Sequence, residues 1–104
     1  MTHRTITYRE RFAEELKVLY DYLYSKDPGK AQQLVAELRE LLEKKVPVHP
    51  YKYPEFEIKA HPDASYRKAA LMKKYWVVYK VTPQTIEAML ILHTSRITEN
   101  ELTV

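Results

Sequence analysis

Apolar residues recur at helical spacing in two stretches of the first half of the chain. In the first stretch they are Phe12, Leu16, Leu19, Tyr20 and Leu23. In the second they are Ala31, Leu34, Val35, Leu38, Leu41 and Leu42. Residues three or four apart share one face of an α-helix, so each stretch predicts a helix with one buried stripe. For both stripes core packing is the favoured interpretation.

Flanking residues set the expected ends of these helices. Thr7 followed by Glu10 has the pattern of a capping box, which predicts a first helix from about Tyr8 to Ser25. Asp27 and Pro28 supply an N-cap and a first-turn proline for the second helix. Pro47 prevents that helix from continuing. Because the connection is short, the two helices are expected to be antiparallel neighbours.

A proline-rich segment follows, from residue 47 to residue 64. Its four prolines, at 47, 50, 54 and 62, exclude a helix or a long central strand. We expect a loop, with a short extended piece at Phe56 to Lys59. A loop of this length in a small domain is functional or a docking surface about as often as it only covers one end of the core.

The last third of the chain has the composition of β-strands, and residues 5–8 share this character. Strands are predicted at Tyr66 to Met72, Tyr75 to Val81 and Ile86 to Thr94, joined by turns around Lys73-Lys74 and Thr82-Thr85. Three consecutive strands with tight turns form an antiparallel meander. The expected order is therefore β-α-α-β-β-β, an α+β fold in one domain of residues 1–104, with a mobile tail over 97–104.

The final strand is apolar on both sides. Alternation places Ile86, Ala88, Leu90 and Leu92 on one face and Glu87, Met89, Ile91 and His93 on the other. This pattern predicts a central strand, or one that a helix covers on one side.

Composition narrows the chemistry that the chain can perform. The chain has 104 residues, a net charge of +3, a single glycine and no cysteine. A disulfide framework, a thiolate site and a glycine-rich phosphate loop are therefore excluded. The four histidines, at 3, 49, 61 and 93, lack the spacing of a metal site, so neither a metal nor another cofactor is expected. No stretch has the length of a membrane span, which makes the cytoplasm the default location.

Basic residues are concentrated in the predicted sheet. They are Arg67, Lys68, Lys73, Lys74 and Lys80, with His93 and Arg96 at the end of the last strand and Tyr66, Tyr75 and Tyr79 among them. Such groups can hold a phosphodiester, stack on bases and move protons. The alternative is that the lysines form a solvated hairpin face, which is the commoner role of a charge run.

His93 and Arg96 differ in their expected roles. They have opposite parity on a continuous strand, so only a strand end or a bulge near Thr94 would bring them together. A histidine between apolar residues is more often a core residue than a catalyst. Arg96 follows the apolar run, where its stem can cover the core while its guanidinium reaches an anion.

Taken with the helical hairpin, the segment YRKAALMKKYWVVYKVTPQTIEAMLILHTSR (66–96) resembles the RelE/ParE superfamily of type II toxins. The shared features are Arg67 opening a strand, the tyrosine-bearing strand YWVVYKV (75–81), and a last strand that ends in LHTSR (92–96). The resemblance implies a toxin neutralised by a cognate antitoxin in a toxin-antitoxin hetero-oligomer. It covers the chain to about residue 96.

The branches of this superfamily imply different targets. In RelE-like members, which cut mRNA on the ribosome, residues matching Arg67, His93 and Arg96 would be catalytic, but no tyrosine follows Tyr79 here. The LHTSR ending is closer to the ParE branch, whose members poison DNA gyrase without being enzymes. The ParE-like reading is favoured. A non-toxic module that binds nucleic acid or protein is a further alternative, since fold does not fix target.

Overall fold

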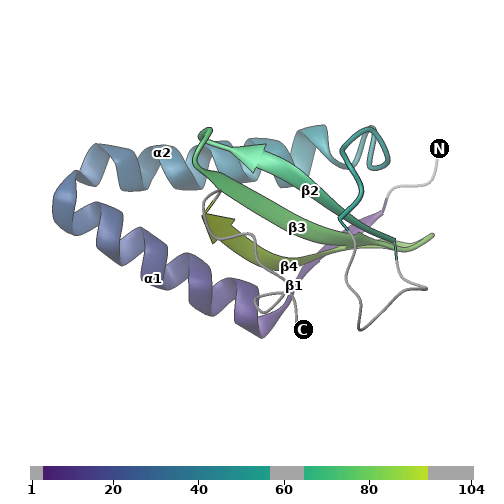
Figure 1. The fold of residues 1–104 in the computed structure, drawn as a ribbon, viewed down its shortest axis with the longest axis horizontal. Helices are drawn as coiled ribbons and strands as arrows, with labels where there is room; N and C mark the ends of the chain where they lie inside the picture. The colour runs from purple at the N-terminus through teal and green to yellow at the C-terminus, as the bar shows by residue number, and fades with distance from the viewer. Residues whose placement is uncertain (1–3, 57–64, 94–104) are drawn as a thin grey trace.

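The structure is a computed structural model that describes residues 4–56 and 65–93. In chain order the elements are β1 (Thr5–Tyr8), α1 (Glu10–Lys26), α2 (Pro28–Arg39), η1 (Glu40–Lys45), β2 (Ser65–Leu71), β3 (Tyr75–Val81) and β4 (Thr85–His93) (Figure 1). The predicted α+β order is thus confirmed. The predicted strand ends agree with the observed ones to within one residue, apart from Thr94, which lies outside the described residues.

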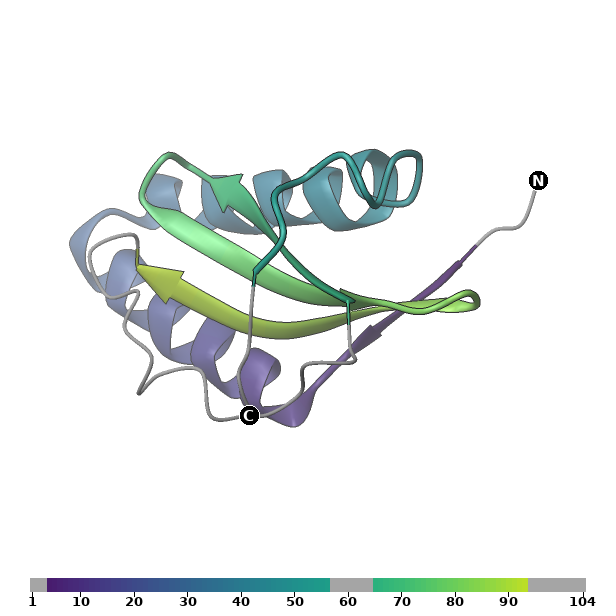
Figure 2. The same ribbon diagram turned by 45° about the vertical axis from the view of Figure 1, so that its right-hand side comes forward.

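The four strands form one sheet in the order β1-β4-β3-β2. β2, β3 and β4 are antiparallel neighbours, as the meander requires, whereas β1 pairs with β4 in parallel through Thr5–Thr85 to Tyr8–Ala88 (Figures 1 and 2). β4 is therefore a central strand. This position explains why its side chains are apolar on both faces.

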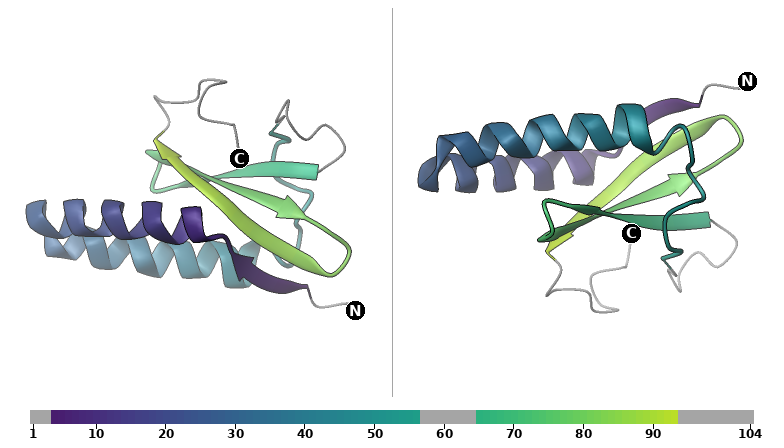
Figure 3. Two further views of the ribbon diagram at one scale, coloured as in Figure 1. Left: turned by 90° about the horizontal axis from the view of Figure 1, so that it is seen from below. Right: turned by 90° about the horizontal axis from the view of Figure 1, so that it is seen from above.

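The antiparallel helices α1 and α2 cover one face of the sheet, and no described helix covers the other (Figure 3). Phe12, Leu34 and Leu42 of the helical layer are fully buried in one cluster with Val77 and Ile86 of the sheet. Complete burial of such a side chain stabilises the fold by about 1.5–3 kcal/mol. A second buried cluster lies on the helix-free face, and its members are Phe56, Tyr66, Val78, Met89, Leu90 and Leu92.

The first helix begins two residues later than predicted, and the predicted capping box is wrong. Thr7 is part of β1 and pairs with Glu87, so its side chain does not cap the helix. The N-cap is Arg9, which makes no side-chain cap bond, and its backbone N–H donates to the Ala88 carbonyl at 2.9 Å. Pairing of β1 with β4 thus takes the place of the predicted side-chain cap. The second N-cap is confirmed, since the Asp27 side chain accepts from the Gly29 N–H at 3.0 Å.

The second helix does not stay α-helical to its end. It widens into the π-helix η1, in which the Val46 N–H donates to the Leu41 carbonyl at 2.8 Å. The wider turn places Leu41, Leu42 and Val46 in the core together. The buried stripe was predicted correctly as far as Leu42, but periodicity gave no sign of the change in helix type.

A β-bulge changes the predicted faces of β4. Tyr79 pairs with Ala88 and Val78 pairs with Leu90, so Met89 is an extra residue without a partner on β3. The predicted grouping of Ile86 and Ala88 with Leu90 and Leu92 is therefore wrong. Ile86 and Ala88 face the helices, whereas Leu90 and Leu92 face the opposite side.

The turn between β2 and β3 has an unfavourable sequence for its shape. Met72 and Lys73 both have positive φ, at 54° and 61°, and the Lys74 N–H donates to the Leu71 carbonyl at 3.3 Å. Two consecutive positive φ values define a type I′ turn, for which Asn-Gly is the preferred pair. Each non-glycine residue in this conformation costs about 1 kcal/mol.

We expect Lys73→Gly to raise the free energy of unfolding by about 1 kcal/mol, because glycine adopts positive φ without strain. In a domain of this size the melting temperature would rise by about 4–8 °C. Lys74→Gly is the matched control, since Lys74 lacks a positive φ and should lose stability. Thermal unfolding of both variants measures the difference, and a fall in melting temperature for Lys73→Gly would contradict this account of the turn.

Candidate functional site

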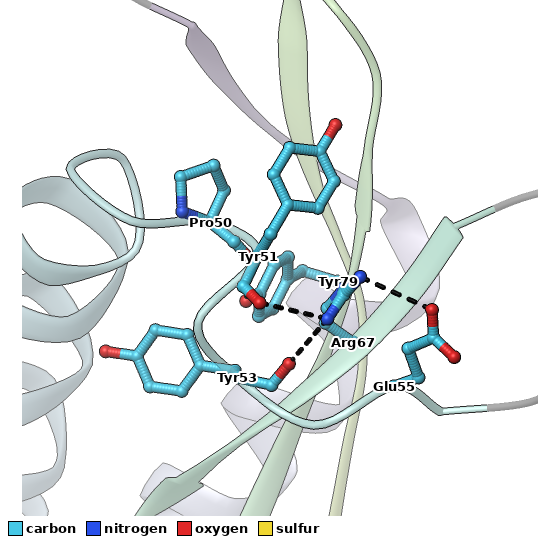
Figure 4. Close-up of polar contacts among 6 residues, drawn as sticks. All are labelled: Pro50, Tyr51, Tyr53, Glu55, Arg67 and Tyr79. Atoms are coloured by element: carbon cyan, nitrogen blue, oxygen red, sulfur yellow. Dashed lines mark hydrogen bonds and ion pairs between the residues drawn. The ribbon is translucent and has the colours of Figure 1, made fainter.

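Arg67, the predicted anion-binding residue of β2, lies under the segment that precedes the strand (Figure 4). Its Nη1 donates to the carbonyls of Tyr51 and Tyr53 at 3.0 and 2.9 Å. Its Nη2 lies 3.4 Å from the Glu55 carboxylate, and only 16% of the side chain is exposed. The Tyr51 ring covers the guanidinium, with 5.2 Å from Cζ to the ring centroid. Arg67 is therefore engaged with its own chain.

The same segment extends the sheet along the edge strand β2. The Lys68 N–H donates to the Pro54 carbonyl at 3.0 Å, and the Phe56 N–H donates to the Tyr66 carbonyl at 2.8 Å. Glu55 and Arg67 form an antiparallel bridge between these bonds. Residues 51–56, here called the edge segment, thus satisfy part of an otherwise open sheet edge. The extended piece predicted over Phe56 to Lys59 is tested only at Phe56, because residues 57–64 lie outside the described part.

Tyr79 anchors the chain directly before the edge segment. It is fully buried, and its hydroxyl donates to the Pro50 carbonyl at 2.7 Å. The Tyr53 ring meets the Tyr79 ring edge-on at 6.2 Å. Burial, with a smaller contribution from Tyr53, raises the pKa of the Tyr79 hydroxyl far above its usual range. Tyr79 is therefore a neutral structural donor and a poor proton acceptor.

Other predicted cations lie on the helix-free face, beside the second buried cluster. The Lys68 ammonium lies 4.6 Å from the centroid of the Trp76 ring and 5.9 Å from that of Phe56. Lys80 pairs with Tyr66 on one side and Glu87 on the other. A surface of cations and aromatic rings can bind phosphates, bases or the acidic surface of a protein.

An ion pair at the β1–β4 border was not predicted from the sequence. The Arg9 guanidinium lies 2.7 Å from the Glu87 carboxylate. Burial raises the pKa of the nearby Tyr66 hydroxyl; Arg9 lowers this pKa and Glu87 raises it, both to a smaller extent. Because Arg9 and Glu87 are 78 residues apart, only the pairing of β1 with β4 could have revealed their contact.

His93 is exposed at the end of β4, so the expectation of a core histidine is wrong. Its ring meets the Tyr75 ring edge-on at 5.6 Å, and the bulge at Met89 places it on the helix side of the sheet. Thr94 and Arg96 lie outside the described residues, so a bulge near Thr94 that would bring Arg96 to His93 is not tested. Lys73 and Lys74 are exposed at the β2–β3 turn.

The predicted site residues are thus placed at separate locations. Arg67 and Tyr79 hold the edge segment, Lys68 and Lys80 lie on the helix-free face, and the remaining lysines lie at the turn. Within residues 4–56 and 65–93, no group of three or more histidines and carboxylates could bind a metal. None of the helices in the described part has the length and apolarity needed to cross a membrane.

Removing the Arg67 side chain should destabilise the fold by about 2–3 kcal/mol, because the carbonyls of Tyr51 and Tyr53 lose a charged donor. Arg67→Lys should lose less than Arg67→Ala, since a lysine can still reach one carbonyl. Lys74→Ala, at an exposed lysine, should stay within about 0.5 kcal/mol of the parent chain. Urea unfolding measures all three variants. Equal stability of Arg67→Ala and Lys74→Ala would refute the anchoring role.

Tyr79 should make the fold sensitive to alkali. Its folded-state pKa is raised above the unfolded value of 10.0, so above about pH 10 the unfolded chain loses a proton that the folded chain keeps. Stability is therefore full below pH 10 and falls as the pH rises further. Tyr79→Phe should be less stable near neutral pH but should lose less on going to alkali. Tyr24→Phe, at a tyrosine that is 51% exposed, is the control and should keep the parent profile.

Comparison with known proteins identifies the family. Residues 6–98 match the family model described as ParE toxin of type II toxin-antitoxin system, parDE. No curated protein sequence matches the chain significantly.

Solved structures with the same fold include a chain of the chromosomal ParDE toxin-antitoxin system from P. aeruginosa. It has 17% identity and a TM-score of 0.58 over 88% of this chain and 96% of that one. YafQ from E. coli strain BL21(DE3) has 19% identity and a TM-score of 0.56, over 88% and 94% of the two chains. A chain of the E. coli DinJ-YafQ toxin-antitoxin complex has 18% identity and a TM-score of 0.55, over 91% of this chain and 97% of that one. At these identities the structures show the fold, and it is the family match over most of the chain that places this protein in the ParE toxin family of type II toxin-antitoxin systems.

Proposed function

We propose that this chain arrests growth by binding DNA gyrase and is neutralised by a cognate antitoxin. The observation that carries the choice of target is the engagement of Arg67. Its Nη1 is hydrogen-bonded to two backbone carbonyls, and the side chain is mostly buried. An arginine held in this way is better placed to position a surface segment than to bind a phosphodiester, and this supports the ParE-like branch.

Proton transfer to and from RNA has little support among the tyrosines of β2 and β3. General acid-base catalysis is most effective when the pKa of the catalytic group lies near the working pH. Burial is the largest cause that raises the pKa of Tyr66, Tyr75 and Tyr79 above the usual tyrosine value. These buried tyrosines therefore act as structural residues and give no support to a ribonuclease centre.

The helix-free face offers chemistry suited to a protein target. Lys68 is held against Trp76, and Lys80 lies across from Glu87 of the Arg9 pair. Aromatic residues are enriched at protein interfaces, and charges around them steer a partner of opposite charge. We propose that Lys68, Lys80 and Arg96 contact the target, that Lys73 and Lys74 contribute charge, and that Arg67 acts by positioning the edge segment.

The antitoxin belongs to the proposal because structural relatives were solved as toxin-antitoxin systems, ParDE and DinJ-YafQ. A hetero-oligomer that holds the toxin inactive until the antitoxin is removed would follow. Since gyrase acts on the chromosome, the cytoplasm is the proposed place of action.

Purified toxin should inhibit gyrase supercoiling of relaxed plasmid and should raise the amount of gyrase-cleaved DNA. In cells, DNA synthesis should fall within minutes of induction, before protein synthesis does. Lys68→Glu combined with Lys80→Glu should weaken gyrase inhibition by about tenfold or more, because both substitutions reverse charge on the proposed surface. Lys17→Glu combined with Lys45→Glu changes the net charge equally at exposed helical positions and should have little effect.

Two results would contradict this function. Cleavage of mRNA on purified ribosomes, with translation failing first in cells, would assign the RelE-like activity and make His93 and Arg96 its candidate catalytic residues. If cells grow normally when folded wild-type protein is induced, the alternative function of a non-toxic binding module would replace the toxin.

A further inference from the structure

The β2–β3 turn lies beside the helical hairpin, at the end of the sheet nearest the α1–α2 connection (Figures 1 and 2). Residues of the turn and of both helices line a cavity there. Its volume is about 320 Å³, and it opens to solvent. Its lining residues are Leu23, Lys30, Gln33, Glu37, Met72, Lys73, Lys74 and Tyr75, and we call it the turn cavity. It is separate from Arg67 and from the helix-free face.

The wall of the turn cavity divides into an apolar floor and a cationic rim. Leu23 and Tyr75 are only 9% and 8% exposed, and Met72 packs against the same core. Lys30, Lys73 and Lys74 are exposed around this floor. In the described part of the chain, none of these three lysines has an ion pair, whereas Lys44 and the arginines at 9, 11, 39 and 67 do. With three lysines against the single carboxylate of Glu37, the cavity wall has a net positive charge.

The strained turn supplies part of this wall. Met72 and Lys73, the residues with positive φ, both line the cavity. Asn-Gly would form the same turn with less strain, but it would provide neither the thioether nor the ammonium group. Local strain that persists where side chains meet a cavity is typical of a binding site.

An exposed aromatic residue, Tyr22, lies near Tyr75 of the floor without lining the cavity itself. Tyr22 is 58% exposed on α1, and its hydroxyl lies close enough to Tyr75 to raise the pKa of that residue, after the larger effect of burial. The Lys26 ammonium lies 5.8 Å from the centroid of the Tyr22 ring. Tyrosine and methionine are enriched at protein interfaces, where rim charges select the partner.

We propose that the turn cavity binds an acidic segment of the antitoxin, with one apolar side chain on the floor and flanking carboxylates against Lys30, Lys73 and Lys74. Two features favour a peptide over a phosphate ester. The floor is apolar and suits a hydrophobic side chain, and the Glu37 carboxylate, which accepts from the Gln33 amide at 2.9 Å, repels the dense charge of a phosphate more strongly than a single carboxylate. The inference rests on the proposed pairing with an antitoxin, and it assigns the partner chemistry of one surface.

The test uses full-length toxin and the antitoxin encoded beside it, with binding measured at several salt concentrations. Lys73→Glu combined with Lys74→Glu should lower the affinity about tenfold or more and should reduce its dependence on salt. Lys73→Gln combined with Lys74→Gln is milder and tests the same charges if the first variant folds poorly. Met72→Ala should speed dissociation without changing the salt dependence. Lys17→Glu combined with Lys45→Glu carries the same net charge as the first variant and should keep the affinity within about twofold.

Unchanged affinity in every turn variant would overturn the inference while leaving gyrase inhibition in place. Equal losses in the turn and control variants would also overturn it, because the effect would then come from net charge alone. Pyrophosphate or AMP binding that shifts the amide resonances of Met72 to Tyr75, with antitoxin affinity preserved in the variants, would assign a phosphate site instead. Absence of antitoxin binding by the wild-type chain would remove this inference and the antitoxin part of the proposed function together.

Discussion

The fold depends on covering both faces of β4, which holds the centre of the sheet. One face of this strand packs against Phe12 and Leu34 of the helices. The other packs in a cluster with Phe56 and Tyr66. The hydrophobic effect therefore requires two coverings, and they differ in kind. The helical hairpin covers one face, whereas Phe56, at the end of the edge segment, belongs to the other.

This requirement explains why a residue with the chemistry of an anion site performs a structural task. The edge segment has little regular backbone pairing of its own, so its carbonyls need donors. Arg67 supplies two hydrogen bonds from one guanidinium, and Tyr79 supplies one to the carbonyl of Pro50, directly before the segment. Both residues are cross-strand partners on β2 and β3, which lets them act at adjacent points. Among the predicted cations on β2, β3 and the turn between them, the lysines are therefore left for recognition.

Periodicity was sufficient to predict the elements that depend on local spacing. The buried helical stripes, the N-cap at Asp27 and the three-stranded meander all follow from residues close together in the chain. The wrong predictions concern features that depend on residues far apart in the chain. Thr7 is drawn into a strand by Glu87, and the extra residue at Met89 is defined only by pairing with β3. The carbonyl partners of Arg67 carry no signal in the sequence, because any residue type provides a carbonyl.

The parallel pairing of β1 with β4 limits how far the protein can fold during its synthesis on the ribosome. β1 is made first, but its hydrogen-bonding partner is the last described strand, residues 85–93. Until that strand has left the exit tunnel, β1 has no neighbour in the sheet and the helical hairpin has only an incomplete surface to cover. A nascent or truncated chain therefore lacks the finished sheet on which the binding surfaces are built. The complete sheet can therefore form only after β4 has been synthesised.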